Sequence, residues 1–425
     1  MSRKDVYELL RTARNTLMGD FMRQYWVPAV LASELPAADC PPVRVKILGE
    51  ELVAFRDTEN RIGLLQESCA HRCASLFFGR NEENGLRCSY HGWKYDVTGQ
   101  CVDMPSEPES STFKDRVKIV SYPAQDHGGV VWVWMGHTPP PPLPDLEWCT
   151  IPDQNRFISK RVQESNWLQA LEGGIDSSHV SFTHRFNLED DPMHNRGQGN
   201  AYLSRDRRPK FETAESDGGL LIAARRDATD TEYYWRITQF ILPWFTLIPP
   251  FGDHALGGHA WVPIDDEHCW VWNINFHPHR PLTDEETSAM RSGMGIHAAL
   301  IPGTFRTVAN KENDYLIDRV AQQEKRTFSG VLGFGQQDSA IQESMGAIQD
   351  RSLEHLGTSD IGILVARRRL FKAATAVRDG GVAPGRDAEQ LRVRAASLLL
   401  PKEVPFSDGL GGALVADPER AVVTL

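Results

Sequence analysis

The chain has 425 residues, which predicts roughly two or three domains, and its 41% hydrophobic and 24% charged residues are typical of globular proteins. A net charge of −11 argues against nucleic acid or an anionic membrane as partner, and no segment has the roughly 18 uninterrupted apolar residues of a spanning helix. Residues 1–20 lack the apolar stretch of a secretion signal, and the seven cysteines do not suggest a disulfide framework. We therefore expect a soluble, cytoplasmic protein.

The first part of the chain changes pattern near residue 40. Residues 5–25 have the pattern of a short amphipathic helix, and we expect segment 1–39 to pack on the larger, C-terminal domain. From Val43 apolar and polar residues alternate, with Gly, Asn and Asp between the runs. The expected strands are 43–47, 52–55, 63–65 and 130–134. Residues 40–138 are thus predicted to form a small all-β domain.

A run of four prolines, Pro139–Pro142, predicts a stiff connector, so residues 139–144 are expected to link two domains. The second domain, residues 145–425, mixes strands and helices, which indicates an α+β fold. Its expected helices are 164–184, 336–356 and 361–377, and its expected strands are 233–242 and 269–276. The residues beyond 380 have no clear pattern.

Two Cys-His pairs stand in the small domain, separated by sixteen residues. Together they offer four ligands: Cys69, His71, Cys88 and His91. Zinc sites usually pair Cys with Cys and His with His, whereas here each pair supplies one of each. A Rieske [2Fe–2S] cluster needs that arrangement, with two Cys on one iron and two His on the other. We interpret C-x-H-x16-C-x2-H as a Rieske site, with zinc as the alternative.

A second pattern, D-x2-H-x4-H, consists of Asp176, His179 and His184. On a continuous helix Asp176 and His179 would share a face, whereas the two histidines would lie about 140° apart. The helix must therefore end or widen between the histidines if both bind one ion. Two His and a distant carboxylate form the facial triad of non-haem Fe(II) oxygenases. The alternative is a set of ordinary polar helix residues, but a Rieske centre needs an acceptor for its electrons.

The third iron ligand must be a carboxylate from elsewhere in the chain. Asp338 is the first candidate, and Glu343 and Asp350 are the alternatives. Spacing alone does not choose among them.

With these motifs the chain resembles the Rieske aromatic-ring oxygenases, most closely the branch similar to phthalate dioxygenase that consists of α subunits only. The resemblance covers most of the chain, and its matching segments are residues 18–26, 69–72, 74–76, 88–93, 104–108, 166–184, 337–338 and 343–346. It implies that Cys69, His71, Cys88 and His91 hold the cluster and that His179, His184 and Asp338 hold the mononuclear iron. Asp176 resembles the aspartate that joins a cluster histidine of one subunit to an iron-ligand histidine of its neighbour. Cys73 departs from the family, because relatives often carry Gly there.

The resemblance also implies a fold and an assembly. The fold is α+β: a small all-β Rieske [2Fe–2S] domain and a helix-grip (START-like) catalytic domain with a curved antiparallel sheet. The assembly is a homotrimer or stacked trimers. The implied activity is that of a terminal oxygenase, which uses O2 and electrons that a flavin- and [2Fe–2S]-containing reductase takes from NAD(P)H.

The implied substrate is an aromatic carboxylate, oxygenated by ring hydroxylation or dihydroxylation; the alternative is O-demethylation of a methoxylated aromatic acid. A non-catalytic Rieske electron carrier would need only residues 40–137, so the remaining chain argues against it. Arginine binds carboxylates bidentately, and the candidates for this role are Arg207, Arg208 and Arg236. Arg236 stands in an apolar strand pattern, whereas a surface charge run is the alternative for any one of the three.

Overall fold

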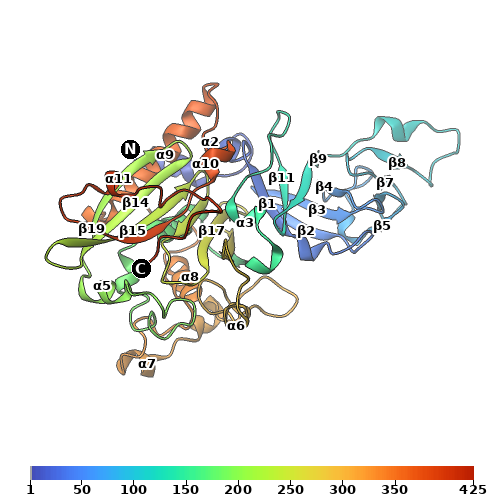
Figure 1. Cartoon of the computed structure of the whole chain (residues 1–425). Helices are drawn as coiled ribbons and strands as arrows, with labels where there is room; N and C mark the ends of the chain where they lie inside the picture. The colour runs from blue at the N-terminus through green and yellow to red at the C-terminus, as the bar shows by residue number, and fades with distance from the viewer. Residues whose placement is uncertain (1) are drawn as a thin grey trace. The chain divides into compact units, whose positions relative to one another are not determined.

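The computed structural model describes residues 2–425, and the chain divides into two compact units (Figure 1). The smaller unit is Thr12–Leu143, and the larger consists of the chain up to Arg11 together with Pro144–Leu425. The second boundary falls within the expected linker. The first differs from the expected one at residue 40, because strand β1 (Trp26–Leu31) pairs with β11 (Val130–Trp134) inside the smaller unit. Only the first helix belongs with the larger unit.

The smaller unit is all-β apart from short helical turns, as predicted. Its three antiparallel sheets have the strand orders β1-β11-β10, β2-β3-β4-β9 and β5-β6-β7-β8. The remaining strands are β2 (Val43–Ile47), β3 (Glu50–Arg56), β4 (Ile62–Gln66), β5 (Arg80–Glu82), β6 (Gly85–Arg87), β7 (Lys94–Tyr95), β8 (Cys101–Asp103), β9 (Ser121–Tyr122) and β10 (Ala124–His127). The helical turns are α2 (Leu17–Met22), η1 (Ala32–Glu34), η2 (Leu76–Phe78) and η3 (Phe113–Arg116).

The helix expected over residues 5–25 is wrong in its continuity. Two helices form instead, α1 (Arg3–Leu10) and α2, and the chain between them includes Asn15 in a left-handed conformation. Thr16 then caps α2, because its side chain accepts a hydrogen bond from the N–H of Gly19. Helix α1 therefore ends at Leu10, where Arg11 is extended, and α2 begins after the Thr16 cap, and hydrophobic period alone predicts neither boundary.

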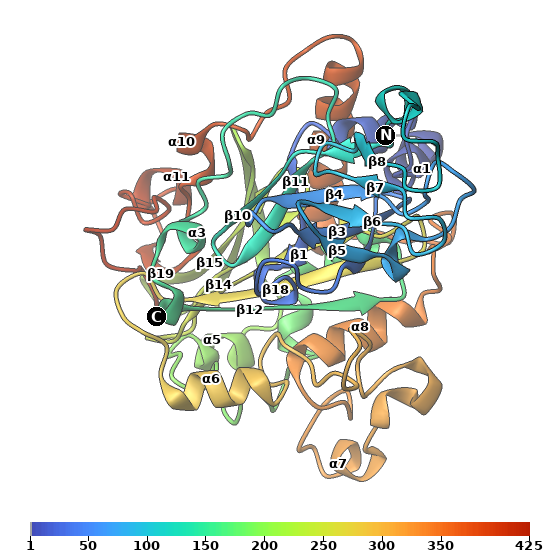
Figure 2. The same cartoon turned by 90° about the vertical axis from the view of Figure 1, so that its right-hand side faces the viewer.

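The larger unit is built on one eight-stranded antiparallel sheet, so the predicted α+β architecture is confirmed. The strand order is β12-β18-β17-β16-β15-β14-β13, and β19 pairs with the free part of β15 beside β16. Figure 2 shows β12 and β18 running side by side. The strands are β12 (Arg156–Gln163), β13 (Lys210–Ser216), β14 (Gly219–Asp227), β15 (Glu232–Ile241), β16 (Phe245–Ile248), β17 (Leu256–Pro263), β18 (Cys269–Phe276) and β19 (Ala396–Pro401).

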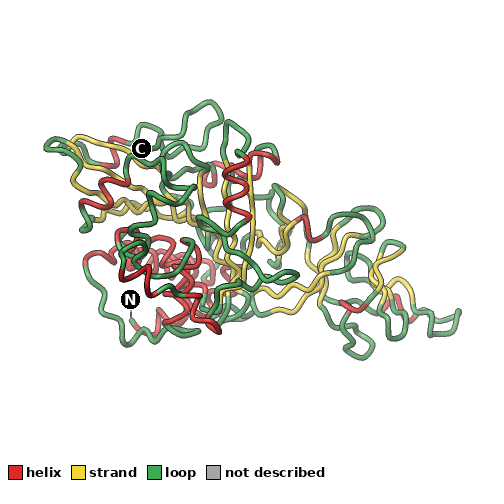
Figure 3. The backbone as a smooth tube through the Cα atoms, turned by 90° about the horizontal axis from the view of Figure 1, so that it is seen from below, coloured by secondary structure: helices red, strands yellow, loops and turns green. Residues whose placement is uncertain are grey.

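Helices gather against one face of this sheet (Figure 3). Helix α4 packs against β15–β17 and α9 against β13 and β14, while α1 packs on both helices. A Cβ atom at Gly174 of α4 would lie 2.8 Å from the indole of Trp261, so this glycine lets the helix approach the sheet. The helices of the unit are α3 (Glu147–Thr150), α4 (Trp167–Ile175), α5 (Asn200–Arg205), α6 (Asp284–Arg291), α7 (Arg319–Gln323), α8 (Phe334–Ser344), α9 (Ile361–Arg378), α10 (Ala388–Leu391) and α11 (Phe406–Gly409).

Four short 3-10 segments complete the larger unit: η4 (Asp153–Asn155), η5 (His179–Ser181), η6 (Lys311–Leu316) and η7 (Thr358–Asp360). The residues beyond 380, which had no clear pattern, contribute β19 to the sheet. Across residues 2–425, no helix combines the length and the apolar character needed to cross a membrane.

Candidate metal centres

Two matching loops carry the four cluster candidates. In the first, the N–H of Cys73 donates to the carbonyl of Cys69, and in the second the N–H of Gly92 donates to the carbonyl of Cys88, at 2.9 and 3.0 Å. Both closing residues have left-handed backbones, with φ of 59° at Cys73 and 78° at Gly92. A glycine adopts this conformation at little cost, as Gly92 does, whereas Cys73 takes the same conformation with a side chain.

The two loops keep sulfur inside and nitrogen near the surface. The side chains of Cys69 and Cys88 are buried in the core of the smaller unit, whereas His71 and His91 are half-buried. The imidazole of His71 stacks on Trp93 and meets His91 edge-on, with ring centroids 4.5 and 4.4 Å apart. The Nδ1 atom of His71 is buried and has no hydrogen-bond partner among residues 2–425. Two thiols and two adjacent imidazoles with a free nitrogen fit a Rieske [2Fe–2S] cluster.

The second candidate site begins where α4 ends. The helix expected over residues 164–184 spans only Trp167–Ile175, because the backbone turns extended at Asp176 and the Asp176 carboxylate accepts a hydrogen bond from the N–H of Ser178 at 2.6 Å. His179 then opens the 3-10 segment η5. The sequence predicted that Asp176 and His179 share an α-helical face. The structure shows that a turn brings these two residues together instead. The sequence predicts that the helix ends or widens between the two histidines, whereas α4 ends before both of them, at Ile175, and only the 3-10 segment η5 ends between them.

Three side chains converge on one point: His179, His184 and Asp338, the last from α8. The two Nε2 atoms are 3.1 Å apart, and they lie 3.6 and 3.3 Å from the same oxygen, Oδ1 of Asp338. Metal–ligand bonds of about 2.1 Å at right angles would separate neighbouring ligand atoms by about 3 Å. The three atoms therefore fit one facial set of positions around a metal ion and leave the opposite side open.

A different group holds each imidazole from behind. Oδ2 of Asp176 lies 3.5 Å from Nδ1 of His179, and Oε1 of Gln337 accepts from Nδ1 of His184 at 2.7 Å. Gln337 is fully buried, and its amide nitrogen donates to the carbonyl of Val331 at 2.9 Å. Such partners fix the ring orientation and the tautomer of a metal ligand. Sequence reasoning missed Gln337, although it directly precedes Asp338.

The electrostatics of the two imidazoles differ. Burial works against a charge on His179, but Asp176 and Asp338 outweigh it and raise its pKa to about 9. Burial dominates at His184 and lowers its pKa to about 4, despite the attraction of Asp338. A metal ion bound here would therefore displace a proton from His179, whereas the lone pair of His184 is already free.

The two alternative third ligands lie elsewhere. Glu343 accepts hydrogen bonds from the N–H of Glu164 and the hydroxyl of Tyr315, and Asp350 is exposed at the N-terminus of a turn. Neither belongs to the three-residue cluster. The geometry therefore favours Asp338, the first of the sequence candidates.

The three-residue cluster lines a cavity of about 70 Å³ that also contains the side chain of Arg236. Arg236 is 2% exposed, donates from Nη2 to the carbonyl of Pro249 at 3.0 Å, and lies over the ring of Phe251. Its Nε atom has no hydrogen-bond partner among residues 2–425. A buried guanidinium with a free N–H, in the same cavity as His179, His184 and Asp338, is suited to bind an anion.

The other two predicted arginines, Arg207 and Arg208, are exposed and do not line the cavity. Helix α5 ends before them, and the N–H of Arg208 donates to the side chain of Asp206 as the chain turns towards edge strand β13. Arg207 and Arg208 therefore do not lie beside the three candidate iron ligands, because the turn directs both side chains to solvent. His259, which sequence reasoning also missed, lines the cavity instead.

An all-β unit with paired Cys-His loops, joined to an α+β unit with a facial set of two histidines and an aspartate, defines a class of protein built for two metal centres. The comparisons agree with that class. A family model described as "Rieske [2Fe-2S] domain" matches residues 25–123, and one described as "LigXa C-terminal domain like" matches residues 133–407.

Named relatives match nearly the whole chain. It is 38% identical to the 3-chlorobenzoate-3,4-dioxygenase oxygenase subunit of Comamonas testosteroni, over 95% of this chain and 96% of the relative. It is 34% identical to the phthalate 4,5-dioxygenase oxygenase subunit of Pseudomonas putida, over 98% of each. It is 32% identical to a 5,5'-dehydrodivanillate O-demethylase oxygenase subunit of Sphingobium, over 86% of this chain and 78% of the relative.

The fold is shared with a solved structure, the oxygenase in the reduced complex between oxygenase and ferredoxin in carbazole 1,9a-dioxygenase. The TM-score is 0.56 at 20% sequence identity, and the match covers 89% of this chain and 92% of that chain. The chain belongs to the Rieske oxygenases with a LigXa-like C-terminal domain.

Proposed function

We propose that this chain is the terminal oxygenase of a multicomponent Rieske system, which uses O2 and NAD(P)H-derived electrons to hydroxylate or dihydroxylate an aromatic carboxylate. The observation that carries the proposal is that Arg236 and the cluster of His179, His184 and Asp338 line one cavity. The names of the chlorobenzoate and phthalate dioxygenase relatives, both acting on aromatic acids, support the substrate class.

The residues that would hold the two metal groups are those of the two sites described above. Cys69, His71, Cys88 and His91 would bind the [2Fe–2S] cluster, and His179, His184 and Asp338 would bind the mononuclear iron. When bound, the cluster supplies one-electron transfer and the iron activates O2. The hydrogen bond from His184 to Gln337 and the contact of His179 with Asp176 keep both imidazoles turned towards Asp338.

Arg236 would orient the substrate by pairing with its carboxylate, which leaves the aromatic ring directed along the cavity. Its guanidinium is held by Pro249 and Phe251, so little conformational freedom is lost on binding. The cavity of about 70 Å³ is smaller than the roughly 150 Å³ that accommodates benzene, so wall residues must move when an aromatic acid enters. Leu188 and His194 are wall residues on a segment, 182–199, that has no helix or strand.

The proposed partners are a flavin- and [2Fe–2S]-containing NAD(P)H reductase and two further copies of this chain in a homotrimer or in stacked trimers. Asp176 supports the trimer, because it lines the cavity beside His179, His184 and Asp338 and also a second cavity of about 220 Å³, which His179 lines as well. Exposed apolar side chains, Ile341 and Met345, border this second cavity. A cluster-bearing loop of a partner subunit would find there both an apolar contact and a carboxylate.

Product analysis tests the proposal. The metal-loaded chain, with a reductase, NADH and O2, is given a panel of aryl carboxylates and the corresponding aryl amides, and products are identified by mass spectrometry. We expect oxygenated acids and no oxygenated amides. Arg236→Gln should raise KM for the acids by about 10-fold or more, whereas Arg208→Gln, at an exposed arginine outside the cavity, should leave it unchanged. Equal turnover of acids and amides by the wild type would contradict the substrate class.

O-demethylation is the alternative that the same panel separates. The O-demethylase relative supports this reaction on a similar chain. A methoxylated acid that loses a methyl group releases formaldehyde and yields a phenol, whereas ring dihydroxylation adds both oxygen atoms to the product. Formaldehyde in place of a diol would assign the second reaction to the chain.

A further inference from the structure

His259 is a buried residue on β17, and its imidazole lines the cavity that also contains His179, His184 and Asp338. Its cross-strand neighbours are Thr246 on β16 and Asn273 on β18. Trp261, on the same face of the strand, lies against Gly174 of α4, so the side chain of His259 stands on the sheet face that α4 covers. It lines the same cavity as Arg236, Thr238 and the three candidate iron ligands, and it is 5% exposed. Trp261, two residues further along the strand, meets its ring edge-on at 4.7 Å.

Neither ring nitrogen of His259 has a hydrogen-bond partner among residues 2–425, and both atoms are buried. The other buried histidines of this unit each have a hydrogen-bond partner at one ring nitrogen or at both. His297 meets Ser159 at 2.7 Å through Nδ1 and Asn275 at 2.9 Å through Nε2, and His194 meets Asp191 at 2.8 Å. Burying a polar group without a partner costs free energy, so an imidazole kept this way at the wall of a binding cavity points to a ligand.

His259 faces the cavity as a neutral ring. Burial lowers its pKa well below the ordinary value, and the positive charge of Arg161 acts in the same direction. A neutral imidazole offers one N–H donor and one lone pair. It therefore suits an uncharged or anionic oxygen better than a cation, and it complements Arg236, which takes the carboxylate.

We propose that His259 donates a hydrogen bond to an oxygen substituent on the ring of the aromatic carboxylate, and that it thereby selects oxygen-substituted aromatic acids over unsubstituted ones. The inference rests on the proposed function. Arg236 and His259 act as two polar points on neighbouring parts of one sheet face, and together they fix both the position and the rotation of the ring. A hydroxyl, a methoxy group and a second carboxylate share the required acceptor oxygen.

Two groups of matched size test the hydrogen bond. The 2-, 3- and 4-methoxybenzoates are compared with the 2-, 3- and 4-ethylbenzoates, which replace the ether oxygen by CH2. Dissociation constants are measured by titration calorimetry on the full chain loaded with both metal groups, so no turnover is needed. For at least one ring position, the wild type should bind the methoxy acid about 10-fold or more tightly than the ethyl acid, because a site built to hydrogen-bond an oxygen rejects the analogue without it.

His259→Phe keeps a ring of similar size and removes both nitrogens. The preference for methoxy over ethyl should fall to about 1 in this variant, while the affinity for the ethyl acid stays within about 3-fold of the wild type. His259→Gln, which retains a donor, should keep part of the preference. An unchanged methoxy/ethyl ratio in both variants would overturn the inference.

A stability measurement separates a ligand-binding imidazole from a structural one. His259→Phe removes an unpaired buried polar group and should leave the unfolding temperature unchanged or raise it. The control is His297→Phe, which abandons Ser159 and Asn275 and should lower the unfolding temperature by several degrees. A loss at His259 as large as that at His297 would identify His259 as structural. If no aryl carboxylate binds to the wild type, the proposed function fails, and the inference with it.

Discussion

The mononuclear site depends most on Asp338. Among residues 2–425, its Oδ1 atom is the only carboxylate oxygen in the group that it forms with His179 and His184. We expect Asp338→Ala to lose the iron that is not part of the [2Fe–2S] cluster, and turnover with it. The cluster ligands lie in a separate unit, so the visible spectrum of the cluster should stay as in the wild type. Metal analysis per chain and an absorption spectrum check both expectations.

Glu343→Gln is the matched control for this prediction. Glu343 lies on the same helix, but its carboxylate is engaged with Tyr315 and the N–H of Glu164. This variant should keep its full iron content. Iron retained in Asp338→Ala and lost in Glu343→Gln would move the third ligand to Glu343.

Sequence predicts residues that act within one loop better than residues that meet across a sheet. The pairs Cys69/His71 and Cys88/His91 were found from spacing, because each pair shares a loop. Asp338 needed a family resemblance, because spacing left Glu343 and Asp350 equally open. His259 carried no signal at all: an isolated histidine in a strand looks ordinary, and only the register of β15–β17 brings it to the face that carries Arg236.

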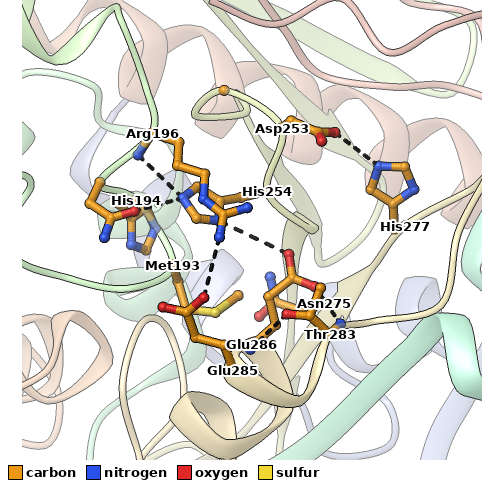
Figure 4. A network of polar contacts seen from close by, with 12 residues as sticks. Met193, His194, Arg196, Asp253, His254, Asn275, His277, Thr283, Glu285 and Glu286 are labelled. Atoms are coloured by element: carbon orange, nitrogen blue, oxygen red, sulfur yellow. Dashed lines mark hydrogen bonds and ion pairs between the residues drawn. The ribbon is translucent and has the colours of Figure 1, made fainter.

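Helix α6 shows how one buried carboxylate fixes an element. Glu286 completes a capping box with Thr283 and also accepts two hydrogen bonds, each of 2.8 Å, from Arg280. Nδ1 of His254 lies 4.0 Å from the same carboxylate, and Figure 4 shows the two residues together. Burial raises the pKa of Glu286, but Arg280 and the cap outweigh it and lower the value to about 2. The contacts of Glu286 with Arg280 and with the cap therefore stabilise the fold only while Glu286 is ionised.

The sign of the pH dependence follows from this lowered pKa. Glu286 contributes its full stabilisation above its ordinary pKa of 4.5 and loses it as the pH falls towards about 2. The contribution is at most about 3 kcal/mol. We expect Glu286→Gln to unfold at a lower temperature than the wild type at pH 7, and the gap to narrow as the pH falls from 5 to 3. Scanning calorimetry of both proteins measures the gap.

His254 also titrates in acid, since burial lowers its pKa to about 4. The carboxylate of Glu286 acts against this lowering, so the attraction between the two groups is part of the gap that the comparison measures. Glu285→Gln is the control, because the exposed pair of Glu285 with Arg196 should contribute under about 1 kcal/mol. A gap between Glu286→Gln and wild type that is constant with pH would show that the ionised carboxylate is not the stabilising group.

The ends of elements were harder to predict than the elements. The strands at 233–242 and 269–276 were confirmed as β15 and β18, because their apolar runs are long and the sheet buries them. The helix at 336–356 ends at Ser344, where Gly346 takes a left-handed backbone, and α4 ends nine residues before the expected limit at His184. Both ends depend on single turn-forming residues, which a hydrophobic period does not detect.

At the scale of the molecule, the described structure is one chain of two units, whereas in the proposed trimer one carboxylate would serve two metal groups on two chains. Asp176 has the features for that role. It follows the last turn of α4, whose position is fixed by the buried ion pairs of Glu172 with Arg351 and Arg367. Its side chain is about a quarter exposed, lies beside His179 and lines the second cavity.

Asp176→Asn tests the bridge, because the change keeps the shape of the side chain but removes its charge and one acceptor oxygen. We propose that in the trimer this carboxylate accepts from His179 and from His91 of the partner subunit, and an amide cannot accept two N–H donors equally well. Both metals should still bind, and the reductase should still reduce the cluster. The pre-reduced cluster is mixed with substrate and O2, and its reoxidation is measured by rapid-mixing spectroscopy. In the variant this reoxidation should be slower by orders of magnitude. An exposed aspartate without this role would change stability by well under about 1 kcal/mol and leave the rate intact, so reoxidation and product formation at the wild-type rate would refute the bridge.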